Sequence, residues 1–311
     1  MIPSAPVVKR KLPRWLIAVM GSLAALAVLA VIVGAFFLYN AHAREIAEEA
    51  WAAVTMPAEL SSALFASAAP GKSVLYERGF LGFRERYPLD GMRISIVRSD
   101  DHVASIARTS DRSPLSLELD GKEMTKISPA ATGLAVSPNG TRFAFQVPSL
   151  VGSSTKSWDI SFFDTETSAA RMVAEGQAPF FIDDERVGII GADGISSLAF
   201  ADSTASTTEL VPLDSSELIQ DVALSPDRTL VGWYDPTAKE IRVYRITDTV
   251  MTPVVSVRST VRSLALSNDR LYLLAPLPDG SKDVWSYTLD DGAGTRIHHL
   301  PASLNIYRMI F

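Results

Sequence analysis

The amino-acid sequence predicts an all-β domain, a β-propeller of about six four-stranded blades, preceded by one transmembrane helix and a short helical stalk. Two observations predict this arrangement. An uncharged apolar segment runs from Trp15 to Tyr39, and a strand–turn–strand pattern then returns about every 38 to 45 residues. We therefore divide the chain into a basic cytoplasmic tail (1–14), a transmembrane helix (15–39), a helical stalk and linker (40–72) and the propeller (73–311).

The apolar segment is long enough to cross a bilayer. About 25 uncharged residues, at about 1.5 Å each, exceed the roughly 30 Å of hydrocarbon. Trp15 and Tyr39 stand at its ends, where aromatic side chains meet the membrane–water interfaces. The segment is preceded by four cations, Lys9, Arg10, Lys11 and Arg14. The positive-inside rule then predicts a cytoplasmic N-terminus and an extracytoplasmic bulk, periplasmic or at the cell surface, with the lipid bilayer as a partner of residues 15–39.

A cleaved signal peptide is the alternative, because Ala41-His42-Ala43 resembles a small-residue cleavage site. The apolar core of a signal peptide spans only about 7 to 15 residues, so we expect an uncleaved anchor. Residues 44–54 keep helical spacing and predict a stalk, and residues 59–65 predict a second short helix. Ala69-Pro70-Gly71 then breaks the helical pattern, within a linker at 66–73.

The repeat consists of an apolar strand, a tight turn and a second apolar strand. Its copies begin near residues 93, 133, 179, 221 and 263. A third, alternating strand follows, such as 158–164, and then a weaker fourth, such as 171–174. We assign a structural role to twelve turn residues, Ser137, Pro138, Asn139, Gly140, Asp183, Asp184, Ser225, Pro226, Asp227, Ser267, Asn268 and Asp269.

Two of these turns carry a resemblance. Ser-Pro-Asn-Gly at 137–140 and Ser-Pro-Asp at 225–227, each followed by an aromatic strand, resemble the WD40-like propeller repeat of TolB-like proteins. The resemblance covers about residues 92–311, although the copy at Asp183-Asp184 lacks the Ser-Pro pair. It implies a propeller that acts as a protein-interaction module.

The two ends of the repeat region suggest how the ring closes. Residues 304–311 have the pattern of an innermost strand, whereas the strands predicted at 73–78 and 83–89 lack a first member. We therefore expect the C-terminal strand to lie beside an N-terminal one, which buries both edges. Ile306, Met309 or Phe311 should then be buried.

Chemical motifs are absent from the sequence, so we predict no catalytic residue, no metal site and no cofactor. His298 and His299 are neighbours on a strand and should face opposite sides, which is poor geometry for a shared metal. Acidic pairs at 100–101, 183–184 and 290–291 fall at predicted turns, where carboxylates cap backbone amides. Four of the 29 basic residues precede the apolar segment, which leaves 25 against 35 acidic residues. Because so acidic a domain would repel the phosphate backbone, we predict no nucleic-acid partner.

Three functions stay open at this point. We favour a protein-binding or scaffold module of the cell envelope, and enzymatic activity is left uncertain. The alternative is an enzyme of hydrolase or lyase type with its site at the central channel, and the third is a regulatory cap on a separate catalytic subunit. Converging carboxylates or a metal in the channel would favour an enzyme, whereas an apolar or aromatic patch would favour docking.

Overall fold

The computed structural model divides the chain into two compact units, Met1–Ala50 and Trp51–Phe311, and each is described by itself. The residues that the structure describes are 26, 28–35, 58–60, 62–69, 72–79, 82–90, 92–99, 102–108, 114–149, 158–191, 194–199, 207–212, 219, 221–247 and 250–311.

The described part of the first unit is helical at residue 26 and at 28–35. Its large apolar side chains are exposed, with exposed fractions between 44% for Val33 and 70% for Val31. Among the described residues no helix is both long and apolar enough to span a membrane. Most of the predicted span 15–39 and all of the predicted stalk helix 44–54 lie outside the described residues.

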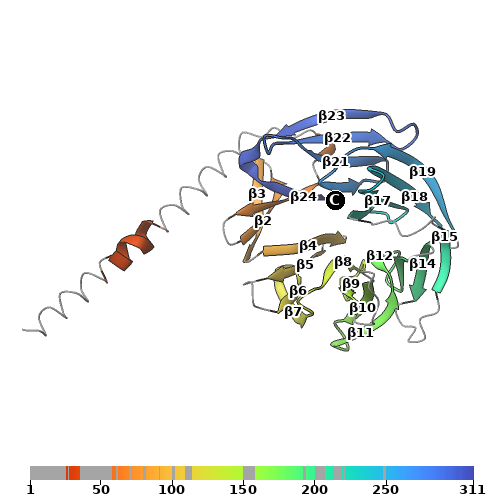
Figure 1. Cartoon of the computed structure of the whole chain (residues 1–311), viewed down its shortest axis with the longest axis horizontal. Coiled ribbons are helices and arrows are strands. Elements are labelled where there is room, and N and C mark those ends of the chain that lie inside the picture. Colours follow the sequence, from red (N-terminus) through yellow and green to blue (C-terminus); the bar gives the residue numbers. More distant parts are fainter. Residues whose placement is uncertain are drawn as a thin grey trace, which may run out of the picture. The chain divides into compact units, whose positions relative to one another are not determined.

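The second unit contains six antiparallel sheets of four strands each among the described residues, as the sequence predicts. Figure 1 shows these sheets arranged as the blades of a propeller around a central axis. We number the blades along the chain and give the strands of each from the axis outward.

The first three blades have the following strands. Blade 1 consists of β24 (Ile306–Ile310), β1 (Leu64–Ala69), β2 (Lys72–Gly79) and β3 (Gly82–Asp90). Blade 2 consists of β4 (Met92–Ser99), β5 (His102–Arg108), β6 (Leu115–Leu119) and β7 (Lys122–Ile127). Blade 3 consists of β8 (Thr132–Val136), β9 (Arg142–Pro148), β10 (Trp158–Asp164) and β11 (Ala169–Glu175).

The other three blades repeat this plan. Blade 4 consists of β12 (Gln177–Phe181), β13 (Arg186–Ile190), β14 (Gly194–Ala199) and β15 (Thr207–Pro212). Blade 5 consists of β16 (Asp221–Leu224), β17 (Leu230–Asp235), β18 (Glu240–Ile246) and β19 (Met251–Arg258). Blade 6 consists of β20 (Ser263–Leu266), β21 (Arg270–Pro276), β22 (Lys282–Thr288) and β23 (Gly294–Leu300). Two short 3₁₀ helices, η1 (Ala58–Leu60) and η2 (Ala302–Leu304), precede β1 and β24.

The ring closes in blade 1, where the C-terminal strand β24 pairs with β1. Leu64 lies opposite Ile310, and Asn305 donates a hydrogen bond from Nδ2 to the Ala68 carbonyl oxygen at 2.8 Å. Ile306 and Met309 are buried, so the predicted closure by an N-terminal strand is confirmed.

The strand that β24 meets corrects our prediction for this region. Residues 64–69, which we expected to end a helix and begin a linker, form β1 and belong to the propeller. The Ala-rich sequence has good helix propensity, but β24 and β2 supply backbone hydrogen-bond partners on both of its sides. Tertiary pairing therefore overrides the local preference.

In blades 1, 2, 3, 4 and 6, a backbone amide at the free edge of the innermost strand donates to a side chain of the preceding blade. The Leu134 amide of β8 donates to Ser95 Oγ at 3.3 Å, and the Met309 amide of β24 donates to Ser263 Oγ at 3.3 Å. Equivalent bonds run from Arg93 to Ser73 (3.4 Å), from Ala178 to Gln146 (2.8 Å) and from Leu264 to Asp221 (2.8 Å). Backbone donors that would otherwise face the channel unpaired thus join neighbouring blades.

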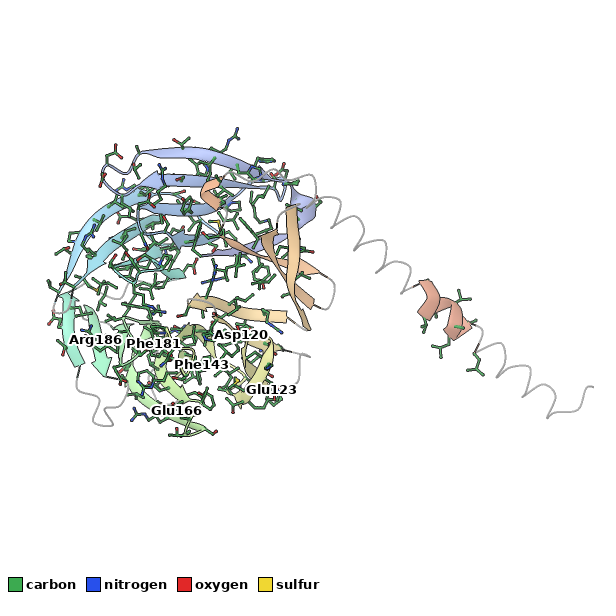
Figure 2. The ribbon with its side chains drawn as sticks, turned by 180° about the vertical axis from the view of Figure 1, so that it is seen from behind. Asp120, Glu123, Phe143, Glu166, Phe181 and Arg186 are labelled. Atoms are coloured by element: carbon green, nitrogen blue, oxygen red, sulfur yellow. The ribbon has the colours of Figure 1, made fainter. Side chains whose placement is uncertain are left out.

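The hydrophobic core lies between adjacent blades. Phe143 of blade 3 packs with Ile106 of blade 2, and Phe181 of blade 4 packs with Phe162 of blade 3. Trp233 of blade 5 packs in turn against apolar side chains of blade 4. Figure 2 shows Phe143 and Phe181 among the sheets. Each blade therefore depends on its neighbours for burial, so an open ring would expose apolar faces.

Replacing Met309 by alanine tests the closure. Met309 is 0% exposed, and Met172 on the outer strand β11, the matched control, is 65% exposed. We expect Met309→Ala to lower the free energy of unfolding by about 2 to 5 kcal/mol, and Met172→Ala to change it by less than about 0.5 kcal/mol. Urea unfolding of the full chain in detergent, followed by tryptophan fluorescence, measures both. Equal effects of the two substitutions would contradict the closure.

Candidate functional site

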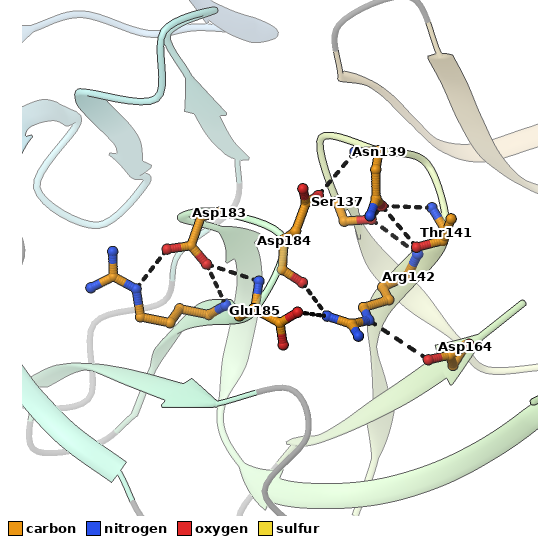
Figure 3. Close-up of polar contacts among 9 residues, drawn as sticks. Ser137, Asn139, Thr141, Arg142, Asp164, Asp183, Asp184 and Glu185 are labelled. Atoms are coloured by element: carbon orange, nitrogen blue, oxygen red, sulfur yellow. Dashed lines mark hydrogen bonds and ion pairs between the residues drawn. The ribbon is translucent and has the colours of Figure 1, made fainter. Parts of the chain in front are cut away.

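The turns between the first and second strands of blades 3 and 5 share one internal design. In blade 3, Ser137 Oγ donates to Asn139 Oδ1 at 2.7 Å and accepts from the Arg142 amide at 3.0 Å (Figure 3). In blade 5, Ser225 Oγ donates to Asp227 Oδ1 at 2.6 Å and accepts from the Leu230 amide at 2.9 Å. The serine and the Asn or Asp of the motif are therefore the polar partners that hold the turn closed.

In blades 4 and 6, whose turns lack the Ser-Pro pair, a turn side chain accepts a hydrogen bond from the turn of the preceding blade. The Asn139 amide of blade 3 donates to Asp184 Oδ1 of blade 4 at 3.0 Å, as Figure 3 shows. The Asp227 amide of blade 5 likewise donates to Asn268 Oδ1 of blade 6 at 3.1 Å. Asp184 and Asn268 stand at the second turn position, where the other copies have proline. The residue that replaces proline at each of these two positions therefore makes a contact between adjacent blades.

The remaining predicted turn residues act within their own turns. Asp183 Oδ1 accepts from the amides of Glu185 and Arg186 at 2.8 and 2.7 Å. Ser267 Oγ donates to Asp269 Oδ1 at 2.8 Å. Of the twelve residues, Ser225 and Pro226 also line a cavity.

This cavity has a volume of about 420 Å³ and lies where the innermost strands end, at the mouth of the central channel. All six blades contribute an apolar residue to its wall. These residues are Val97, Val136, Phe180, Leu224, Leu266 and Ile310. Its size and its apolar wall are typical of a ligand-binding pocket.

Among the residues that the structure describes, the charged side chains that line the cavity are three arginines. Arg98 of β4 donates from Nη1 to the Ser62 carbonyl oxygen at 2.9 Å. Arg308 of β24 pairs through Nη1 with Asp221 Oδ1 at 2.9 Å. The third arginine, Arg228, lies in the turn between the first two strands of blade 5. Arginine stays protonated under ordinary conditions, so three guanidinium groups stand beside the apolar wall of the cavity.

Arg228 reaches across the channel mouth. Its Nη1 donates to the Phe181 carbonyl oxygen of blade 4 at 2.6 Å, and its Nη2 donates to Ser99 Oγ of blade 2. Blades 2 and 5 lie opposite each other in the ring of six. One guanidinium therefore connects three blades at the channel mouth.

The backbone of Arg228 is left-handed, with φ of 59°. The corresponding turn of blade 3 has Gly140 at this position, with φ of 70°, and a Cβ there would lie 2.7 Å from His102 Cδ2. A non-glycine residue in this conformation costs on the order of 1 kcal/mol or more. The arginine was not among our predicted site residues, although its replacement of glycine in an otherwise matching turn was visible in the sequence.

The other residues considered from the sequence are kept apart from the cavity. His102 Nδ1 lies 2.9 Å from Asp120 Oδ2 on the same blade. His299 Nδ1 lies 2.8 Å from Asp283 Oδ1, and its neighbour His298 has a buried Nε2, so burial lowers the pKa of His298. Within the described ranges no group of three acidic or histidine side chains could hold a metal. His42 and the pair 100–101 lie outside those ranges.

Comparison with known proteins relates the chain to other propellers by structure. No family model and no curated protein sequence matches it. TolB from Acinetobacter baumannii is similar with a TM-score of 0.57 and 12% identity, over 82% of this chain and 67% of that one. A nidogen/laminin complex gives 0.53 and 10% identity, over 80% and 97%. An oligogalacturonate lyase solved with manganese gives 0.50 and 11% identity, over 78% and 75%. At these identities the similarity establishes the propeller fold.

The turn design predicts a difference in pH dependence between Asp227 and asparagine. Burial would raise the pKa of Asp227, but hydrogen bonds from Ser225 and Thr229 outweigh it and hold the pKa below its usual range. The folded state thus favours the ionised form of the Asp227 side chain, and ionisation stabilises the fold. This contribution to stability is lost as the pH falls below about 4. In Asp227→Asn, the side-chain carbonyl oxygen can still accept the hydrogen bonds of the turn, as Asn139 Oδ1 does in blade 3. The stability advantage of wild type over this variant, about 1 kcal/mol or less for so exposed a group, should shrink between pH 6 and pH 3.

Urea unfolding at several pH values measures this difference. The reverse change, Asn139→Asp, is the matched control and should add the same pH dependence to blade 3. A wild-type advantage that stays constant down to pH 3 would contradict the assigned role of Asp227.

Proposed function

We propose that this protein is a membrane-anchored β-propeller, facing away from the cytoplasm, that binds a protein partner of the cell envelope at the channel mouth. The observation that carries the proposal is the cavity there, with its apolar wall and its rim of Arg98, Arg228 and Arg308. Arginine is among the residues most enriched in binding hot spots, which lie in well-packed pockets from which water is excluded.

The position of the cavity also supports binding. It is formed by the ends of the innermost strands and by turn residues, all held by contacts between blades. Such a rim is pre-organised, so a partner would lose little free energy in ordering it. TolB is the structural neighbour with the highest TM-score of the three described, and it shares the propeller that would present this face.

Membrane anchoring rests on the sequence and on one structural feature. The uncharged segment 15–39 follows four cations, and the described helical residues 28–35 within it expose apolar side chains. A helix that presents an apolar surface in this way is suited to lipid.

An enzyme is the alternative. The similarity to an oligogalacturonate lyase concerns the fold and gives it only weak support. Acid–base chemistry needs a group that titrates near the working pH, and in the described part of the cavity wall the charged residues are arginines. The wall therefore favours binding.

The topology is tested by protease treatment of intact cells or spheroplasts. Protease should degrade residues 44–311 and spare the N-terminal tail, and the chain should stay in the membrane pellet after a carbonate wash. A soluble form that begins at Arg44, or a protected propeller, would overturn the anchor or its orientation.

The binding face is tested by a photo-crosslinking amino acid at Val222, which lines the cavity, with Met172 on the outer strand as the control position. Illumination of native membranes should give a discrete crosslinked protein from position 222. Equal products from both positions, or none from position 222, would contradict binding at the channel mouth.

A further inference from the structure

We infer that the cavity of the channel binds one large, uncharged apolar side chain of the protein partner, and that this side chain lies between β16 of blade 5 and β4 of blade 2. This inference rests on the proposed protein-binding function and names the chemistry of the group that is bound.

The first argument is where the wall of the cavity is still accessible. Most of its apolar residues are buried by the blades themselves, as are Leu266 and Val136, which are 0% and 4% exposed. β16 differs, because all four of its residues, Asp221–Leu224, are partly exposed. Residues 222–224 line the cavity and therefore offer it apolar surface that the fold leaves uncovered.

The second argument is the wall opposite β16. Blades 2 and 5 face each other across the ring of six, and Val97 of β4 is also partly exposed where it lines the cavity. The guanidinium of Arg228 crosses the mouth between the same two blades and donates to Ser99 Oγ of blade 2. The two accessible walls are therefore tied to each other. A side chain that enters between them meets a site that is already formed.

The third argument is that the charged groups at the cavity have partners within the protein. Arg308 is paired with Asp221, and Arg98 and Arg228 each donate to a backbone carbonyl oxygen. A charged ligand would have to compete for these bonds and would lose its own hydration in the cavity. An apolar side chain carries neither penalty. We therefore assign the arginines to the framework of the cavity rather than to the binding of a charged ligand.

The fourth argument is size. The volume of about 420 Å³ lies within the roughly 300 to 1,000 Å³ of ligand pockets, and an apolar cavity of about 150 Å³ already holds benzene. The space therefore holds an aromatic ring or a branched aliphatic side chain, together with part of the backbone that carries it. Entry of such a group removes apolar surface from water on both partners, which favours association.

The test uses the absence of cysteine from the chain. One cysteine is introduced by Val222→Cys on β16, or by Met172→Cys on the outer strand β11 as the control. The full chain in detergent is equilibrated in a disulfide-exchange buffer with phenethyl mercaptan as the apolar probe, thioglycolate as the anionic probe or cysteamine as the cationic probe. Intact-mass spectrometry measures the fraction of protein that carries each thiol.

We expect the apolar thiol to be favoured over both charged thiols at position 222 by about tenfold more than at position 172, because burial of an aromatic ring is favourable. Partition of the apolar thiol into detergent and the reactivities of the three thiols affect both positions, so the comparison of positions cancels them. Equal incorporation of the three thiols at position 222, or the same preference at both positions, would overturn the inference.

A pair of matched substitutions in the Val222→Cys protein tests the wall itself. Leu224→Asn makes the wall polar, whereas Val250→Asn makes the same kind of change at a residue that is 44% exposed and directly precedes β19. We expect Leu224→Asn to abolish the preference for the apolar thiol and Val250→Asn to keep it. A preference that survives Leu224→Asn would contradict the assignment to β16. If Leu224→Asn does not fold, the comparison of positions 222 and 172 still decides.

The photo-crosslinking experiment connects the cavity to the partner. The peptide crosslinked to position 222 should contain a large apolar residue. Its replacement by alanine in the partner should remove the crosslink, and replacement of a neighbouring charged residue by a neutral one should not. A crosslink that depends on the charged residue instead would overturn the inference and leave the protein-binding function standing. The absence of any crosslinked protein would remove the protein-binding function, whatever the thiols show.

Discussion

The constraint on which the structure depends is the free edge of each innermost strand. A four-stranded blade leaves the backbone donors of its first strand facing the channel, and buried unpaired donors are costly. Ser95, Ser263 and Asp221 each accept such a donor from the next blade, as do Ser73 and Gln146. The same contacts that satisfy the backbone therefore set the distance between blades. In blade 1 this requires a C-terminal strand, because β24 supplies the innermost edge that the N-terminal strands lack.

The channel mouth follows from this constraint. Because the innermost strands end together, their last residues and the turns after them converge on one cavity. The turns are not equivalent there. Asp184 and Asn268 hold the turn of the preceding blade, whereas Arg228 extends over the channel. Small departures from a repeated turn thus give contacts between adjacent blades in two cases and a contact across the channel mouth in the third.

The repeat predicted the fold well because its signals are local. Ser-Pro turns, aromatic second strands and alternating third strands recur along the chain, and the C-terminal innermost strand was recognisable from its own pattern. β1 was missed because its alanines resemble a helix and its strand partners lie far away in sequence. Arg98 and Arg308 were missed because nothing local distinguishes a channel arginine from a surface one. Convergence of side chains from opposite blades is a property of the closed ring, which linear order does not display.

The most direct test of this account is amide hydrogen exchange at the innermost strands. In Ser263→Ala, the Met309 amide should exchange faster while the Leu134 amide, which donates to Ser95, keeps its protection. In Ser95→Ala the pattern should reverse. If neither amide changes, or if both change together in each variant, side chains of the preceding blade do not hold the innermost edges, and the account of the ring is wrong.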